Sequence, residues 1–337
     1  MGVYYRPIPS VDPAFAHMGL PIAGGWARFT HIEVLRRDAA AEVVPIDALP
    51  DVAARLATAP VVAPLNLRRP VIMGILNVTP DSFSDGGDHA EAAAAVEHAQ
   101  QMTAAGADII DVGGESTRPG AVTVPVADEI QRTSPPIAAM RAAGIAQAVS
   151  IDTRKAPVAQ AALDAGATII NDVSGFTYDP DLMQVARNSD VPVCVMHAQG
   201  DPATMQNDPT YDDVLLDVYD WLAGRIAALE AAGIAKSRII ADPGIGFGKT
   251  LHHNLALLRR ISLFHGLGVP VLLGVSRKRF IGTIGQAPEA KDRAPGSIAV
   301  AQAALDQGIQ IMRVHDVAET RQAVALWQAL VASEGHE

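Results

Sequence analysis

Hard oxygen donors gather directly after one short apolar run of the sequence. Residues 71 to 76 (VIMGIL) have the length and composition of a buried strand, and the following NVTPDSFSDGG supplies amide, hydroxyl and carboxylate oxygens. Such oxygens suit Mg²⁺ or hydrogen bonds to a substrate better than they suit a soft metal. For Asp85 and Asp88 the simpler interpretation is a cap on the helix expected near Ala90. For Asn77, which ends the strand, the sequence favours a functional role.

A second candidate is the loop GGESTRPGA, residues 113 to 121, which follows another apolar run. It places Glu115, Thr117 and Arg118 between glycines, next to Pro119. The planar guanidinium of an arginine suits a phosphate or carboxylate ligand. An arginine in a loop can instead pair with a neighbouring carboxylate, here that of Glu115. The composition of the loop favours the ligand over this pairing.

Asp152, Asn171 and Asp242 form a third group, because each ends an apolar run. Burying such polar groups is costly unless they are hydrogen-bonded. Two carboxylates and an amide directed at a pocket suit a flat heterocycle that carries N–H and NH₂ donors. Alternatively, the three residues cap the following helices or lock the layers of the interior. Three such residues at the same end of their strands favour the ligand.

Local cations are needed if the ligand is anionic, because the net charge of the chain is −11. The stretches SRKRFIG (276 to 282) and RVHD (313 to 316) supply Lys278, Arg313 and His315 at the ends of two further runs. Together these side chains suit a diphosphate. Arg277 and Arg279 are expected to face solvent or to pair with acids, as surface charges usually do.

Eight apolar, β-branched runs position these residues, and alanine-rich helical stretches separate the runs. The runs span residues 71–76, 108–112, 148–151, 168–171, 191–196, 238–241, 269–275 and 310–314. Eight β-α units in about 265 residues predict an α/β fold of the TIM-barrel type, in which all the loops after the strands open on one face. An open doubly wound sheet is the alternative, because one sequence does not reveal strand order.

Residues 1 to 69 differ from the rest and are interpreted as an N-terminal appendage to a catalytic domain of residues 70 to 337. The segment ARFTHIEVLRR is expected to form a strand, and IDALPDVAARLAT a short helix. Neither carries a recognisable catalytic group. We therefore expect the appendage to pack on the main domain or to plug it.

The composition argues against several classes of protein. The acidic net charge of −11 disfavours general binding to nucleic acid. No stretch reaches the roughly 20 apolar residues that span a bilayer, and the first residues lack the pattern of a signal peptide. The single cysteine, Cys194, excludes an internal disulfide, and its setting in VPVCVM predicts a buried strand residue. A soluble, cytoplasmic protein is expected.

Two stretches that look like motifs are not interpreted as sites. PGIGFGKT (243 to 250) ends like a P-loop, but Pro243 occupies the place of the first required glycine. His252 and His253 are consecutive and therefore point apart on a helix, and the chain has no H-E-x-x-H motif. No zinc site is predicted.

Eight stretches from about residue 70 onward carry a family resemblance. In order, they are ILNVTPDSFSDGG, GADIIDVGGESTRPGA, SIDTRK, IINDVSG, VCVMHAQG, DPGIGFGKT, LLGVSRKRFIG and RVHDV. Together they closely resemble the dihydropteroate synthases of folate biosynthesis. The resemblance implies a TIM-barrel transferase that joins 6-hydroxymethyl-7,8-dihydropterin diphosphate to p-aminobenzoate, giving 7,8-dihydropteroate and diphosphate. It also implies Mg²⁺, a homodimer, and sulfonamide drugs that occupy the p-aminobenzoate site.

The resemblance also assigns roles to residues of this chain. The pterin ring would be held by Asp152, Asn171, Met196, Asp242 and Lys278. The diphosphate would be bound by Asn77, Arg118, Arg313 and His315, with Asn77 also meeting Mg²⁺. The p-aminobenzoate site would be bordered by Thr117, Pro119, Phe247, Ser276 and Lys278. The residues expected to matter most for catalysis are Asp152, Arg118, Lys278 and Asn77.

The implied reaction is SN1-like, because the pterin helps to expel diphosphate and leaves a cationic methylene that Asp152 would stabilise. The segment 79 to 87, with Asp81, Phe83 and Asp85, is expected to act as a lid. Two other functions are open: a pterin-binding methyltransferase domain and a catalytically silent folate-binding barrel. Arg118 and the RVHD cluster disfavour the first, and the full set of polar strand ends disfavours the second.

Overall fold

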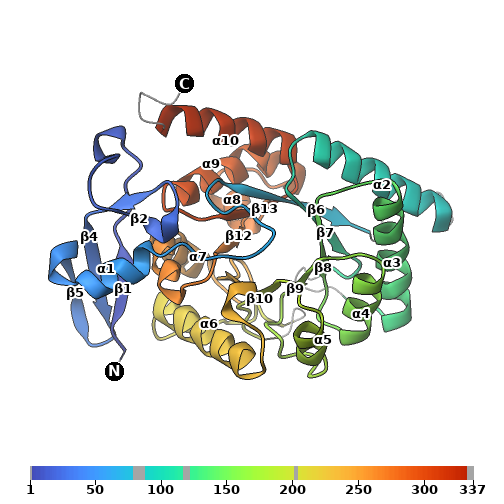
Figure 1. Cartoon of the computed structure of the whole chain (residues 1–337), viewed down its shortest axis with the longest axis horizontal. Coiled ribbons are helices and arrows are strands. Elements are labelled where there is room, and N and C mark those ends of the chain that lie inside the picture. Colours follow the sequence, from blue (N-terminus) through green and yellow to red (C-terminus); the bar gives the residue numbers. More distant parts are fainter. Residues whose placement is uncertain (1, 79–87, 117–121, 201–203, 332–337) are drawn as a thin grey trace.

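The computed structural model describes residues 2–78, 88–116, 122–200 and 204–331 of the chain. It consists of a barrel of parallel strands surrounded by helices, with a smaller N-terminal unit attached to one side (Figure 1). The barrel begins at Val71, where the first predicted apolar run begins.

The barrel contains the eight predicted strands, each within three residues of its expected ends. They are β6 (Val71–Asn77), β7 (Ile109–Gly113), β8 (Ala148–Asp152), β9 (Ile169–Asp172), β10 (Val193–Met196), β11 (Ile239–Asp242), β12 (Leu272–Gly274) and β13 (Ile311–Val314). Only β12 is much shorter than expected. Pro270 lies in the predicted range, and it has no N–H to donate to a neighbouring strand.

The sheet closes on itself. Its strand order is β11-β10-β9-β8-β7-β6-β13-β12, and neighbours within it are parallel. A parallel bridge between Ala241 and Val271 joins the two ends of this order, and the Ala241 N–H donates to the carbonyl of Pro270 at 2.9 Å. The TIM-barrel prediction is therefore confirmed, and the open doubly wound alternative is wrong.

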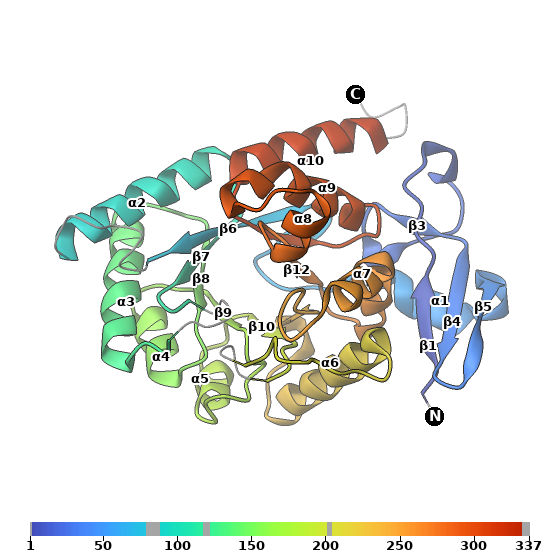
Figure 2. The ribbon, with the colours of Figure 1, turned by 180° about the vertical axis from the view of Figure 1, so that it is seen from behind.

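Helices cover the outside of the barrel (Figures 1 and 2). They are α2 (Asp88–Ala104), α3 (Val126–Ala142), α4 (Ala156–Asp164), α5 (Leu182–Asn188), α6 (Val214–Ala231), α7 (Leu251–Arg259), α8 (Arg279–Ile284), α9 (Ala294–Leu305) and α10 (Val317–Val331). All of these except the short α8 were expected from the sequence. None of the helices among the described residues has the length and apolarity needed to cross a membrane.

The barrel interior has a core of its own at the end where the strands begin. Apolar side chains from seven strands meet there: Val71, Met73, Ile109, Ile169, Cys194, Ile240, Leu272 and Ile311. Val62 and Leu67, from the segment that leads into β6, belong to the same cluster and close this end. Cys194 is buried, as predicted, and burial raises the pKa of its thiol well above the usual value.

The N-terminal unit is built around a three-stranded antiparallel sheet, in the order β1-β4-β5. Its strands and α-helix are β1 (Tyr4–Pro7), β2 (Leu20–Pro21), β3 (Arg28–Phe29), β4 (His31–Arg36), β5 (Ala39–Pro45) and α1 (Pro50–Ala57). Strand β4 and helix α1 lie within the segments predicted to form a strand and a helix. Phe29, Ile32 and Leu56 are buried in a separate small core between them.

The N-terminal unit is attached to the outside of the barrel by polar and aromatic contacts. The Tyr4 hydroxyl donates to the Asp220 carboxylate on α6 at 2.7 Å, and the Trp26 indole donates to the Leu305 carbonyl at 2.7 Å. The ring of Trp26 also meets that of Trp327 on α10, with centroids 5.8 Å apart. Figure 2 shows the unit beside the barrel on this side, away from α3 and α4.

Candidate active site

The predicted polar residues form one row around the carboxyl ends of the strands. In the strand register, Asn77 is opposite Gly113, Gly113 is opposite Asp152, and Asp152 is opposite Asn171. Further around the barrel, Met196 is opposite Asp242. The residues that the sequence places at the ends of separate runs are therefore neighbours on one rim.

The alternation of side chains explains why these residues face inward. Ile109, Ile240 and Ile311 belong to the interior core, and residues two positions apart on a strand point to the same face. Asp111, Asp242 and Arg313 follow these isoleucines by two positions, and they lie inside the barrel one layer above the apolar core. The mouth of the barrel is therefore lined with charge.

Arg313, whose side chain is 22% exposed, is the centre of a largely buried ion cluster at this mouth. Its guanidinium donates to the Asp111 carboxylate at 2.6 Å and to the Asp152 carboxylate at 2.7 Å. The Asn171 amide donates to both carboxylate oxygens of Asp111, at 3.3 and 3.4 Å. Burial lowers the pKa of Arg313, but Asp111 and Asp152 raise it more, and the net shift is upward. The cluster therefore carries a permanent positive charge on Arg313.

Asp111 was not predicted as a site residue. It lies in the middle of β7 and is fully buried, and its apolar neighbours in the sequence favour an ordinary strand residue. A usable signal was present in the run DIIDVG, where a carboxylate stands two residues before the strand end, in phase with the interior. Because it holds both Arg313 and Asn171, Asp111 sets the orientation of two predicted ligand-binding side chains.

Asp152 combines strong burial with an incomplete set of partners. One of its oxygens accepts from Arg313, whereas the other, Oδ1, is buried without a hydrogen-bond partner among the described residues. Burial, opposed by Arg313 and reinforced by Asp111 and other acids, raises the pKa of Asp152 from 3.8 to about 7. A ligand that donates an N–H to Oδ1 would complete the site and favour the charged form.

The other side of the mouth is built from Asp242 and Lys278. Asp242 accepts from the Gly244 N–H at 2.7 Å, and burial raises the pKa of Asp242. The Lys278 ammonium donates to the carbonyl of Ile245 and lies 4.6 Å from the centroid of the Phe247 ring. Burial lowers the pKa of Lys278 to about 8, although Asp242 opposes this shift. Three predicted residues, Asp242, Phe247 and Lys278, are thereby gathered in one place.

The stretch PGIGFGKT is the loop that holds Phe247 there. Gly244 has a φ of +66°, and a Cβ at this position would lie 1.8 Å from the carbonyl oxygen of His197. Only glycine fits this close approach. The Lys249 ammonium donates to the Phe247 carbonyl at 3.0 Å and contacts the ring nitrogen Nδ1 of His197 at 2.8 Å. Burial first, and Lys249 second, lower the pKa of His197 to about 2.

Ser276 and His315 contact each other at the ends of neighbouring strands. The Ser276 hydroxyl lies 2.9 Å from Nδ1 of His315 and accepts from the His315 N–H at 3.1 Å. The resemblance assigns these two residues to different substrates, so the contact marks where the two substrates would meet. Arg277 pairs with Asp316, as predicted for a cation outside the site, and Arg279 is exposed.

Several predicted residues lie outside the part of the chain that the structure describes: Thr117, Arg118, Pro119, Asp81, Phe83 and Asp85. Glu115, the alternative partner suggested for Arg118, is described. Its carboxylate accepts from Arg154 at 2.9 Å and from Lys155 at 2.7 Å.

None of Asp152, Asn171 and Asp242 is the N-cap of a helix whose cap is described, so the helix-capping alternative for them is wrong.

The donors available for a metal ion at the rim are few. Within residues 2–78, 88–116, 122–200 and 204–331, no group of three or more His, Cys, Asp or Glu side chains is arranged to hold a metal. Asn77, exposed at the end of β6, offers one hard amide oxygen. This fits Mg²⁺, which binds through few protein ligands when a substrate phosphate supplies the others.

Comparison with known proteins identifies the family. The sequence pattern of the family described as "Pterin binding enzyme" matches residues 73–315. The dihydropteroate synthase of Escherichia coli (strain K12) is 47% identical over 270 residues, which are 80% of this chain and 95% of that protein. The dihydropteroate synthase of Neisseria meningitidis serogroup B is 46% identical over 271 residues, 79% of this chain and 94% of that protein.

Solved structures agree with this match. A Xanthomonas albilineans dihydropteroate synthase with 4-aminobenzoic acid has a TM-score of 0.75 and 46% identity, and covers 80% of this chain and 95% of its own. A Yersinia pestis dihydropteroate synthase with a sulfonamide drug complex has a TM-score of 0.74 and 46% identity, over 79% of this chain and 95% of its own. This chain therefore belongs to the pterin-binding enzyme family, and within it to the dihydropteroate synthases.

Proposed function

We propose that the rim described above joins 6-hydroxymethyl-7,8-dihydropterin diphosphate to p-aminobenzoate. The observation that supports this most directly is the connected group of buried Asp111, Asp152 and Asn171 with the partly buried Arg313 at the mouth of the barrel. A related Xanthomonas albilineans enzyme, with 43% identity, is described in complex with 7,8-dihydropteroate, the expected product.

The pterin would lie between the two carboxylates of the rim. Oδ1 of Asp152, which lacks a partner among the described residues, would accept from a ring N–H, and Asp242 would accept from the exocyclic amine. Asn171 covers the mixed donor and acceptor edge, and Met196 is buried next to Asp242 and would pack on the ring. Lys278 would donate to the pterin carbonyl.

The diphosphate would be bound by the cations and the amide at the other edge of the mouth. Arg313 and His315 would hold its oxygens, together with Arg118, which lies outside the described residues. Asn77 would hold Mg²⁺, which supplies Lewis-acid stabilisation of the leaving group when it is bound. Thr117, Pro119, Phe247 and Ser276 would border p-aminobenzoate, and Asp81, Phe83 and Asp85 stay predicted parts of a lid.

The reaction needs no protein nucleophile. The bond between the methylene carbon and the diphosphate oxygen breaks, the electron pair leaves with the diphosphate, and the pterin takes the positive charge. The carboxylate of Asp152 stabilises that charge at short range in a site from which water is largely excluded. The amine nitrogen of p-aminobenzoate then attacks the methylene carbon and afterwards loses a proton.

A homodimer in the cytoplasm completes the proposal. The single cysteine is buried as a free thiol, as is usual in a reducing compartment. Leu326 and Leu330 on α10 are 63% and 78% exposed, and a second copy of the chain would cover apolar side chains of this kind. Sedimentation of the full chain would measure the oligomeric state.

Release of diphosphate tests the proposed activity. Purified protein is mixed with the dihydropterin diphosphate, and diphosphate is measured with and without p-aminobenzoate and with and without Mg²⁺. We expect release only when both are present. Release without p-aminobenzoate would indicate hydrolysis, and binding of pterin without any release would indicate a methyltransferase-like or silent barrel.

A further inference from the structure

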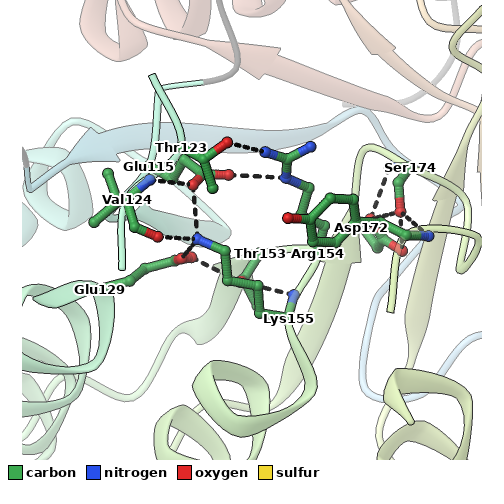
Figure 3. Close-up of polar contacts among 10 residues, drawn as sticks. Glu115, Thr123, Val124, Glu129, Thr153, Arg154, Lys155, Asp172 and Ser174 are labelled. Atoms are coloured by element: carbon green, nitrogen blue, oxygen red, sulfur yellow. Dashed lines mark hydrogen bonds and ion pairs between the residues drawn. The ribbon is translucent and has the colours of Figure 1, made fainter. Parts of the chain in front are cut away.

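Four buried charged side chains beside the rim are not used by the reaction proposed above. Glu115, Glu129, Arg154 and Lys155 are each at most 8% exposed, and we call this set the loop brace (Figure 3). Charges are rarely buried this completely, because removing them from water costs several kcal/mol per ion before pairing offsets it. The brace therefore needs an explanation.

Lys155 is the centre of the brace. Its ammonium donates to Glu115 at 2.7 Å, to Glu129 at 2.6 Å and to the backbone carbonyl of Val124 at 2.6 Å. An ammonium has three protons, and these contacts account for all of them. The side chain of Lys155 is thus held by three different segments, which meet in Figure 3.

Arg154 reinforces the same group from the side that faces β9. Its guanidinium donates to Glu115 at 2.9 Å and to the hydroxyl of Thr123 at 3.2 Å. The guanidinium carbon also lies 4.0 Å from the centroid of the Tyr178 ring. A planar cation that pairs and stacks at once has little rotational freedom, and it fixes the groups it contacts.

These contacts join the two stems of one loop. Glu115 lies just after β7, and Val124 lies just before α3; the Val124 N–H donates to Glu115 at 2.7 Å, and Lys155 binds both residues. Arg154 and Lys155 in turn follow Asp152 by only two and three residues. The brace therefore sets the position of both stems relative to the carboxylate that faces the pterin.

Stability alone does not explain this arrangement. Replacing a buried ion network with apolar side chains of similar volume is often neutral or stabilising, whereas removing one partner is costly. Burial raises the pKa of Glu115, but Lys155, the Val124 N–H and Arg154 lower it further, so the carboxylate is charged. Because the charged groups of the loop brace are paired with one another, the brace favours a single geometry of the segments it joins.

We propose that Glu115, Arg154 and Lys155 are positioning residues that hold the two described ends of the loop between β7 and α3, at Glu115 and at Val124, in register with Asp152 and thereby set the affinity for the arylamine substrate. The inference rests on the proposed function, which assigns the p-aminobenzoate site to this loop. The brace itself does not touch the reacting atoms. Arg118 of the same loop is proposed to bind the diphosphate beside Arg313 and His315, so the brace should affect the dihydropterin diphosphate as well, but less than p-aminobenzoate.

The test is a comparison of Lys155→Met with Arg6→Met. Arg6 pairs with Glu33 in the N-terminal unit, with side-chain exposures of 14% and 8%, and Glu33 also pairs with Arg260 at 3.1 Å, so loss of Arg6 controls for the removal of one cation from a largely buried ion network. We expect Lys155→Met to raise KM for p-aminobenzoate about 10-fold or more, because small displacements of a binding group have effects of this size. KM for the dihydropterin diphosphate should rise by a clearly smaller factor, because Asn77, Arg313 and His315 would still bind the diphosphate.

Two further variants keep the test decisive. If Lys155→Met does not fold, the double variant Lys155→Met with Glu129→Gln replaces it, because Glu129 is then uncharged and Glu115 keeps its ion pair with Arg154. Arg154→Met should raise KM for p-aminobenzoate by a smaller factor, and Arg154→Lys should recover part of the loss. Equal KM values for p-aminobenzoate in the Lys155 variants, Arg6→Met and the unmodified protein would overturn the proposal, as would an equal rise for both substrates.

A binding measurement separates this proposal from the proposed activity. If the unmodified protein releases no diphosphate, the activity fails, and calorimetric titration of p-aminobenzoate in the presence of inorganic diphosphate and Mg²⁺ still compares Lys155→Met with the unmodified protein. Weaker binding in the variant alone supports the brace. Equal binding, or no binding to either protein, overturns it.

Discussion

The two ends of the barrel interior differ in chemistry although the same strands build both. At the closed end, Ile109 and Ile311 pack in an apolar core. Two residues further along the same strands, Asp111 and Arg313 form an ion pair at 2.6 Å. A step of about 7 Å along a strand thus separates a hydrophobic core from a charged site.

This difference shows that residues at the closed end of the barrel serve mainly stability, whereas residues at the open end serve mainly ligand binding and catalysis. The closed end is sealed by Val62 and Leu67, so its side chains contribute through burial and packing. At the open end the charges are paired with one another, and one oxygen of Asp152 is left for a ligand. Changes at the open end should therefore affect activity most, and changes at the closed end should affect stability only.

Arg313→Met should give the largest effect and should act on both properties. Loss of the cation that binds diphosphate should lower kcat/KM at least about 10²–10³-fold. It also leaves Asp111 and Asp152 buried without their cation, which should destabilise the fold by about 3–5 kcal/mol. Steady-state kinetics and urea unfolding measure the two effects. Turnover near that of the unmodified protein would remove Arg313 from the site.

Ile311→Ala, two residues earlier on the same strand, should affect stability alone. Ile311 is fully buried, and truncating a buried isoleucine typically costs about 2–5 kcal/mol. Urea unfolding measures this loss, and kcat of the folded fraction at a temperature below the transition should stay within about twofold. A large fall in kcat with little change in stability would show that the two ends are not separate.

The sequence predicts this arrangement well where it depends on local pattern. The eight apolar runs specify the barrel strands, and Asp152, Asn171 and Asp242 stand at their ends because chemistry in this fold is placed there. Cys194 could be assigned to a buried strand from its neighbours alone. These predictions need only the period of a strand and the polarity of the residue that ends it.

Contacts between distant segments could not be predicted in the same way. The Ser276–His315 contact joins residues 39 apart and depends on the register of β12 with β13. Glu129 lies on α3 and meets Lys155, 26 residues away in the sequence, only in the folded chain. Asp111 is an intermediate case, because its phase on β7 was visible, but its partner Arg313 is 202 residues away.

The pH dependence of activity also distinguishes the two ends, and we expect this effect to be smaller than those of the two substitutions above. The pKa of Asp152 is about 7 and that of Lys278 about 8, so kcat/KM, which reports groups of the free enzyme, should be bell-shaped. It should fall about tenfold per unit of pH below 7, as Asp152 is protonated, and again above 8, as Lys278 loses its proton. A flat profile from about pH 5.5 to 9 would contradict these roles.

Stability should change in the opposite direction over the acidic part of the same range. The folded-state pKa of Asp152 is raised from 3.8 to about 7, chiefly by burial, so the folded protein binds this proton more tightly than the unfolded chain does. The resulting stability is fully present below pH 3.8 and is lost as the pH rises through about 7. Unfolding of Asp152→Asn and the unmodified protein at several pH values measures this difference. Ile311→Ala keeps Asp152, so its loss of stability relative to the unmodified protein should be the same at every pH. If Asp152→Asn follows the unmodified protein at every pH, Asp152 is not the group that titrates, and the open end is no more sensitive to pH than the core.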